Sequence, residues 1–141
     1  MAGRDAYLQH LASIPLFAPL SQNELKKVAR ASDQVTVKAG RHLVEQGAIG
    51  REMFVLVDGN ATVRRNGRKV ATLGPGAAVG ELSLLDRGPR TATVTADDDC
   101  TVLVLGAREF SALLDEVPGI THKLLAAMAA RIRDLDTQVY G

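Results

Sequence analysis

The chain has 141 residues, which is the size of one ordinary domain. Its 17 basic and 16 acidic side chains nearly balance, which argues against bulk electrostatic binding of nucleic acid or of an anionic membrane. Apolar residues make up 46% and charged residues 23%, so wholesale disorder is excluded. The apolar stretches are too short for a membrane span, and no signal-peptide core follows the first residues. We therefore expect one cytoplasmic domain over residues 1–141.

The N-terminal segment, residues 1–33, is predicted to be helical. Apolar side chains recur at helical spacing within residues 5–11. Prolines at positions 15 and 19 then predict a tight apolar turn. Ser21 is followed three residues later by Glu24, which is the capping-box pattern for a second helix over roughly residues 22–31.

The middle segment, residues 34–106, has the pattern of a β-domain. Apolar and polar residues alternate at 34–38 and 60–64, which predicts half-buried strands, and residues 53–57 form a continuous apolar run. Two dipeptides, Asp58-Gly59 and Asn66-Gly67, are hairpin-turn signals. The predicted strands cover residues 34–38, 53–57, 60–65, 68–73, 91–95 and 101–105. Many short strands without a long helix between them predict an antiparallel β-barrel or jelly roll, in a mainly β fold with flanking helices.

The C-terminal segment, residues 107–141, returns to helical spacing. A helix over residues 108–116 precedes Pro118, which is well placed to begin the next helix. Apolar residues then recur at steps of three or four and form one stripe, made of Ile120, Leu124, Met128, Ile132, Leu135 and Val139. The neighbouring charged residues Arg131, Arg133 and Asp134 are predicted to form a solvated face. One interpretation is that the stripe closes over the barrel as a core helix does, and the others depend on the resemblance described below.

The densest group of unusual residues lies at positions 73–94. Three glycines (74, 76 and 80) precede a short helix at 81–85, and Arg90 opens the strand that follows Gly88-Pro89. Glycine before a helix lets backbone N–H groups approach an anion, and a guanidinium completes such a site. Glu81 suits the site if it faces a hydroxyl of the same ligand while Arg90 offsets its charge. This pattern favours a nucleotide, although a glycine-rich turn with a surface Glu–Arg pair remains the alternative.

The same residues resemble the phosphate-binding cassette of cyclic nucleotide-binding domains. That family carries approximately Gly-Glu-Leu-(Ala/Ser)-Leu and then Pro-Arg-(Ala/Thr/Ser)-Ala-Thr-Val, and this chain has Gly80-Glu-Leu-Ser-Leu84 and Pro89-Arg-Thr-Ala-Thr-Val94. A second motif at residues 46–63 matches the family's turn glycines and barrel-facing aromatic through Gly47, Gly50, Phe54 and Gly59. The resemblance covers nearly the whole chain. It implies a jelly-roll barrel with N-terminal helices and C-terminal hinge and lid helices.

Carried over by position, the resemblance implies a role for each cassette residue. Arg90 would pair with the cyclic phosphate, and Glu81 would accept the ribose 2′-hydroxyl. Backbone N–H groups around Gly80, Leu82 and Thr91 would contact phosphate or sugar oxygens. Ser83 would bond the sugar or serve only as a solvent or capping group. The stripe would also supply a cap over the base, with Ile132, Leu135 and Val139 as the candidates.

The resemblance implies a non-enzymatic cyclic nucleotide receptor that signals by moving its C-terminal helix. Thr91 does not settle the base, because family members with threonine there include both cGMP-binding and cAMP-preferring proteins. We favour cAMP as the usual ligand among bacterial members and keep cGMP open. Val79 departs from the phenylalanine that many members carry before the Gly-Glu pair. No cofactor and no metal are expected.

The sequence also gives expectations about the partners of the receptor and about alternative functions. The chain ends at Gly141 without a helix-turn-helix, so direct DNA binding is not expected. We expect the receptor to act through a downstream protein partner, as a stand-alone ligand buffer, or as a piece of a longer protein. A homodimer through the C-terminal helix is an open alternative, as is a scaffold module that no longer binds ligand. A small-barrel metalloenzyme is disfavoured, because His10, His42 and His122 lie in separate regions. Cys100 is predicted to be a buried structural thiol.

Overall fold

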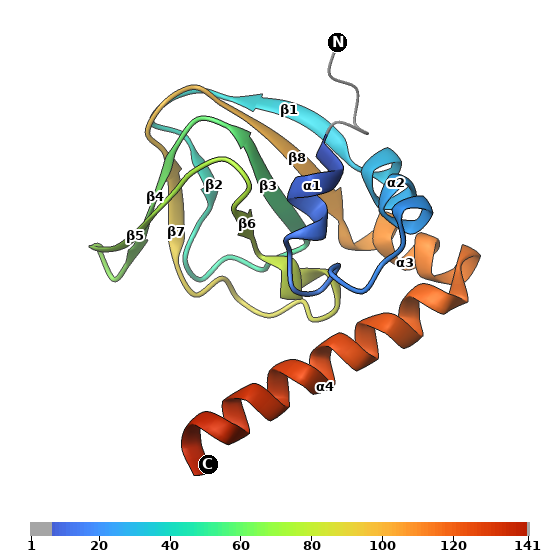
Figure 1. Cartoon of the computed structure of the whole chain (residues 1–141). Coiled ribbons are helices and arrows are strands. Elements are labelled where there is room, and N and C mark those ends of the chain that lie inside the picture. Colours follow the sequence, from blue (N-terminus) through green and yellow to red (C-terminus); the bar gives the residue numbers. More distant parts are fainter. Residues whose placement is uncertain (1–6, 141) are drawn as a thin grey trace.

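The computed structural model describes residues 7–140, with the side chains of residues 7–137. Two short helices precede a β-barrel, and two helices follow it (Figure 1). The helices are α1 (Leu8–Ala12), α2 (Gln22–Ala31), α3 (Ala107–Glu116) and α4 (Pro118–Tyr140), and a 3₁₀ helix η2 (Glu81–Leu84) lies within the barrel segment. Between α1 and α2, residues 13–20 form the predicted apolar turn, in which Leu16 and Phe17 are fully buried.

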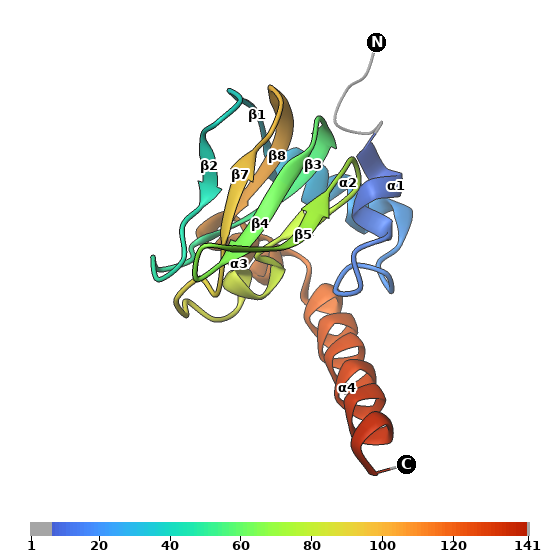
Figure 2. The ribbon, with the colours of Figure 1, turned by 90° about the vertical axis from the view of Figure 1, so that its left-hand side faces the viewer.

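The barrel consists of two antiparallel sheets of four strands each in the described part of the chain. One sheet has the order β1-β8-β3-β6, and the other has the order β2-β7-β4-β5. The strand bounds are β1 (Asp33–Val37), β2 (His42–Val44), β3 (Glu52–Asp58), β4 (Ala61–Arg65), β5 (Arg68–Leu73), β6 (Ala78–Val79), β7 (Thr93–Ala96) and β8 (Cys100–Gly106). Figure 2 shows the two sheets facing each other. The predicted jelly-roll fold with flanking helices is confirmed.

Two apolar cores hold the domain together. The smaller core fills the barrel between the sheets and includes Leu56, Val94 and Val102, with the half-buried Phe54 packed against it. The larger core lies between the first sheet and the helices, where the rings of Phe17 and Phe110 have centroids 5.9 Å apart. The helices are therefore bound to the barrel by burial of apolar side chains, which is the main stabilising contribution to folding.

Two elements, helix α2 and the turn between β4 and β5, have the structure that their local sequence predicts. Helix α2 has the predicted bounds, and its capping box is complete: the Ser21 hydroxyl accepts from the Glu24 backbone N–H, and the Glu24 carboxylate accepts from the Ser21 backbone N–H. At the turn between β4 and β5, Asn66 and Gly67 have positive φ angles of 54° and 79°. A two-residue hairpin with these φ angles matches the twist of its strands, so this turn is confirmed.

Three local expectations were wrong. Asp58-Gly59 is not a hairpin turn, because β3 pairs with β6 and β8, whereas β4 pairs with β5 and β7 in the other sheet. Strand β1 is exposed over most of its length instead of half-buried, because it lies at the edge of its sheet. Strand β7 begins at Thr93, so Arg90 lies in the preceding loop and opens no strand.

Helix α4 packs on the domain only through its first half. Ile120 and Leu124 are buried against the larger core, and Met128 is half-buried. Ile132 and Leu135 are 65% and 61% exposed, because α4 projects away from the barrel (Figure 2). The interpretation in which the stripe closes over the barrel therefore fails at Ile132 and Leu135, and the side chain of Val139 lies outside the described residues. None of the helices within residues 7–140 has the length and apolar character that a membrane crossing requires.

Glu24 is expected to make the fold more stable near neutral pH than in acid. The Lys123 ammonium of α4 and the Ser21 backbone N–H both donate to its carboxylate and lower the pKa of Glu24. Such a carboxyl contributes stability above its unfolded pKa of about 4.3, and this contribution is lost as pH falls through the lower folded pKa.

The substitution Glu24→Gln keeps an oxygen for the capping box and removes the charge. It should lower the free energy of unfolding by about 0.2–1 kcal/mol at pH 7 and by less in acid, as measured by urea denaturation at both pH values. A cost that is independent of pH would contradict this account.

Candidate functional site

The guanidinium of Arg90 is held in a fixed position beside the cassette. Its Nη1 donates to the Ser83 hydroxyl at 3.0 Å, and its Nη2 donates to the Glu52 backbone carbonyl at 2.7 Å. Ser83 lies on the 3₁₀ helix η2 and is itself buried, whereas Glu52 begins strand β3. Two elements that are distant in the sequence therefore orient one cation.

Two glycines leave the space that this guanidinium occupies. Gly80 has a φ of +76°, and a Cβ there would overlap Nη1 of Arg90. A Cβ at Gly50 would lie 2.9 Å from Cζ of Arg90 and would overlap the Ser83 hydroxyl. Both positions require glycine because the backbone passes so close to the cation, and Gly80 also requires it for its left-handed conformation.

Backbone hydrogen bonds join the two motifs found in the sequence. The Arg90 N–H donates to the Ala48 carbonyl, and the Gly47 N–H donates to the Arg90 carbonyl, each at 2.8 Å. The Gly50 N–H donates to the Gly88 carbonyl at 3.1 Å. The loop at residues 45–51 is therefore bonded to the end of the cassette, and the two motifs lie side by side in the structure.

Arg90 forms no ion pair with any residue that the structure describes. Its partial burial lowers the pKa of its guanidinium, and the nearby Glu52 carboxylate partly opposes this effect. Arginine nevertheless stays protonated at physiological pH. The site thus holds a half-buried cation whose present partners are neutral oxygens, an arrangement that favours an added anion.

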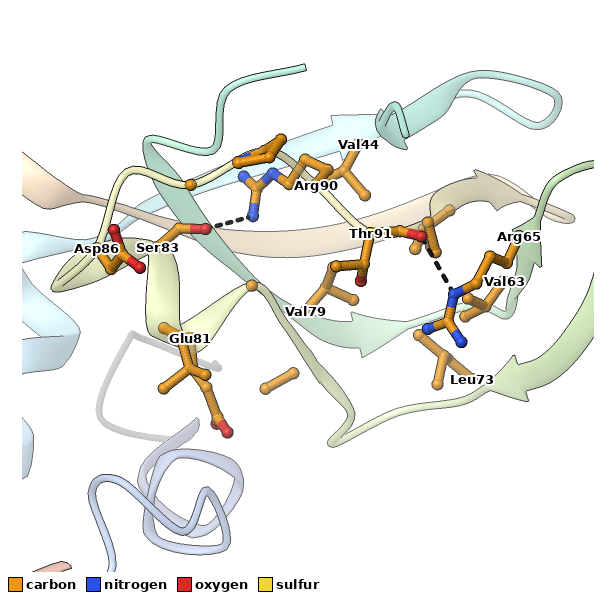
Figure 3. A pocket seen from close by; sticks show the side chains of 17 residues that line it. Val44, Val63, Arg65, Leu73, Val79, Glu81, Ser83, Asp86, Arg90 and Thr91 are labelled. Carbon is orange, nitrogen blue, oxygen red and sulfur yellow. Dashed lines mark hydrogen bonds between the residues drawn. The ribbon is translucent and has the colours of Figure 1, made fainter. Parts of the chain in front are cut away.

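Arg90 is one of the residues that line a pocket with a volume of about 550 Å³ (Figure 3). The volume is typical of small-molecule sites. Apolar side chains from both sheets line much of the pocket, including Val44, Val63, Leu73, Val79 and Val94. Polar side chains also line it, namely Arg65, Glu81, Ser83, Asp86, Arg90 and Thr91. The pocket therefore combines a fixed cation with a largely apolar wall.

Glu81 lines the pocket but is paired with a residue of helix α4. Its Oε1 accepts from Nη1 of Arg131 at 3.0 Å. In Figure 3 the Glu81 carboxylate points away from Arg90 and Ser83. One expectation was therefore wrong for this structure: Arg131 is not merely part of a solvated face. The structure shows no ion pair between Arg90 and Glu81, and the expected offset of the Glu81 charge by Arg90 beside a ligand stays a prediction.

The structure brings the predicted cassette residues together and leaves the predicted cap residues apart. Gly80, Glu81, Leu82, Ser83, Arg90 and Thr91 all line the pocket. Ile132 and Leu135 are not among its lining residues, and the side chain of Val139 lies outside the described residues. A cap made by these residues would require α4 to move, and it stays a prediction.

Sequence reasoning did not single out two arginines that belong to the site. Arg65, at the end of β4, lines the pocket, and its Nε donates to the Thr91 carbonyl at 3.2 Å. Arg131 lies 50 positions from Glu81, and no local pattern connects the two residues. The sequence places Arg65 beside the Asn66-Gly67 turn, at the end of a predicted strand, and nothing in that pattern points to the pocket.

Comparison with known proteins places this geometry in a family. The family model described as the cyclic nucleotide-binding domain matches residues 34–117, which include the cassette and all of the barrel except the first residue of β1. The chain belongs to the cyclic nucleotide-binding domain family. Within the described residues, this domain has no group of three or more His, Cys, Asp or Glu side chains that could hold a metal ion.

Several relatives resemble this cyclic nucleotide-binding domain along most of its length. The N-terminal domain of a transcriptional regulator from Streptomyces coelicolor A3(2) superimposes with a TM-score of 0.85 at 34% identity, covering 91% of this chain and 95% of that one. The Cyclic AMP receptor protein of Thermus thermophilus is 31% identical over 130 residues, covering 89% of this chain and 60% of the relative.

A channel is also similar to this domain. The human potassium/sodium hyperpolarization-activated cyclic nucleotide-gated channel 4 is 33% identical over 108 residues, covering 77% of this chain and 9% of the channel. The chain thus spans 60% of the Thermus relative and a small part of the channel. The family is shared, while the activities of those longer proteins are properties of the relatives.

Proposed function

We propose that this domain is a cAMP receptor that binds its ligand in the cassette pocket and performs no catalysis. The observation that carries the proposal is the Arg90 guanidinium, which is half-buried, oriented by Ser83 and Glu52, and unpaired with any described carboxylate in the lining of a pocket. A cyclic phosphate is a monoanion with several acceptor oxygens, and a fixed guanidinium binds such a group through charge-assisted hydrogen bonds.

The remaining cassette residues receive complementary roles. Backbone N–H groups around Gly80, Leu82 and Thr91 would hold phosphate or sugar oxygens, and Ser83 would contact the sugar. The Glu81 carboxylate would accept the ribose 2′-hydroxyl. The apolar wall with Val63 and Leu73 would receive the base. The name of the Thermus relative, Cyclic AMP receptor protein, supports adenine over guanine as the first choice.

The proposed output is a change in the position of helix α4. Its first half is fixed to the domain, and its second half is exposed. A ligand can move the second half only by binding one helix position more tightly than the other. We propose that the moved helix, with Ile132, Leu135 and Val139, covers the base and that a downstream partner recognises the change.

Isothermal titration calorimetry with cAMP and with cGMP tests the proposal. We expect saturable binding of cAMP, with weaker binding of cGMP. A thermal-unfolding series should agree, because ligand at about 100 times its Kd adds about 2.7 kcal/mol to the apparent stability. Absence of both heat and stabilisation with either nucleotide would favour a scaffold module that no longer binds ligand.

A further inference from the structure

The ion pair between Arg131 and Glu81 joins helix α4 to the cassette. Its 3.0 Å separation brings together two residues that are 50 positions apart. The Glu81 side chain is 19% exposed and that of Arg131 is 44% exposed, so the pair lies at the rim of the pocket. Within residues 129–137, the described contacts include no other hydrogen bond or ion pair to the barrel.

The ion pair lies in the part of α4 that does not pack on the apolar cores. The first half of the helix is anchored by Ile120 and Leu124 in the larger core and by the ion pair of Lys123 with Glu24. Beyond Met128, α4 has no apolar anchoring in the described cores. The contact of Arg131 with Glu81 therefore holds the projecting second half of α4 to the cassette.

We propose that Arg131 is a positioning residue that latches α4 to Glu81 in the ligand-free domain and competes with the ligand for this carboxylate. This inference rests on the proposed function, in which Glu81 accepts the sugar hydroxyl. In Figure 3 the Glu81 carboxylate points away from Arg90 and Ser83. Turning it toward the sugar breaks its contact with Arg131 and frees the second half of α4.

The latch lowers the apparent affinity for the nucleotide, because only the unlatched fraction of molecules offers a free Glu81 carboxylate. By the same linkage, bound nucleotide lowers the fraction of latched α4. Because Arg131 is partly exposed, the effect is modest: removing a partly solvated ion pair corresponds to about a two- to fivefold change in an equilibrium constant.

Two charge-matched variants and two nucleotides test the latch. Arg131→Gln should bind cAMP about two- to fivefold more tightly than the parent, as measured by calorimetry. Arg133→Gln, an exposed residue of the same helix, makes the same charge change and should leave the affinity unchanged. The analogue 2′-deoxy-cAMP lacks the hydroxyl that competes for Glu81, so Arg131→Gln should not alter its affinity. Weaker cAMP binding by Arg131→Gln, or an equal gain with both nucleotides, would overturn the proposal.

A measurement on the ligand-free protein separates the latch from the proposed function. Spin labels on Thr36→Cys in β1 and Thr137→Cys in α4 report the position of the helix by electron paramagnetic resonance. The native Cys100 is buried, and burial raises the pKa of its thiol, so it reacts slowly. Arg131→Gln should broaden the distance distribution, whereas Arg133→Gln should not. Identical distributions would overturn the latch whether or not cAMP binds. Failure of the parent to bind any nucleotide would overturn the proposed function and the competition for Glu81, while the restraint of α4 by Arg131 would still be decided by the distance distributions.

Discussion

Replacing Arg90 by alanine is expected to weaken cAMP binding by about 30-fold to several thousand-fold. Truncating one partner of a buried, hydrogen-bonded charge pair costs about 2–5 kcal/mol, and each 1.4 kcal/mol is a factor of ten. The phosphate would enter a pocket where, among the described residues, Arg90 is the cation bonded to both Ser83 and Glu52. Calorimetric titration of the variant measures the loss.

Two control variants separate the role of the Arg90 guanidinium from a general loss of positive charge. Arg87→Ala removes an exposed arginine three positions earlier and should bind cAMP as the parent does. Arg90→Lys keeps the charge but loses the planar fork that contacts two oxygens together, so its affinity should lie between those of the parent and Arg90→Ala. If Arg90→Ala bound cAMP as tightly as the parent, the assignment of the phosphate to Arg90 would be wrong.

The second large effect is expected at Gly80. A side chain at its φ of +76° is strained by about 1–2 kcal/mol, and the added Cβ would overlap Nη1 of Arg90. The guanidinium must shift to relieve this overlap, which removes it from the position set by Ser83 and Glu52. We expect Gly80→Ala to bind cAMP about tenfold more weakly or worse, in addition to its loss of stability.

Gly40 supplies the matched control for backbone strain. Its φ is +86°, and a Cβ there would meet no atom within 4 Å. Gly40→Ala should therefore lose stability through strain alone and keep its affinity, as measured by thermal unfolding and calorimetry on the same samples. Equal losses of affinity in both variants would show that strain, and not displacement of Arg90, accounts for the effect at Gly80.

Features set by neighbouring residues could be predicted from the sequence. The Ser21–Glu24 capping box and the Asn66-Gly67 turn depend on hydrogen bonds and φ angles within a few residues. The cassette is recognisable in the sequence because Gly80, Glu81 and Arg90 lie within eleven positions of one another. The structure places these residues around one pocket, although their contacts with a ligand remain predictions.

Features that depend on distant packing could not be predicted. The Asp58-Gly59 dipeptide indicates a turn, but it does not decide whether the following strand pairs back or joins the other sheet. The helical spacing of apolar residues likewise predicts the apolar face of α4. It does not predict how far along the helix this face is packed, and the packing ends near Met128. The pairing of Arg131 with Glu81 arises from the direction in which α4 leaves α3, and no spacing rule encodes it.

The central claim is that Arg90 binds the cyclic phosphate while Glu81 holds the adjacent sugar. A crystal structure of the domain grown with cAMP measures this directly. We expect guanidinium nitrogens of Arg90 at about 2.7–2.9 Å from phosphate oxygens, with the ribose hydroxyl donating to Glu81 and Arg131 released from that carboxylate. A nucleotide bound with its phosphate away from Arg90, or an Arg131–Glu81 pair that persists beside the bound sugar, would contradict the account.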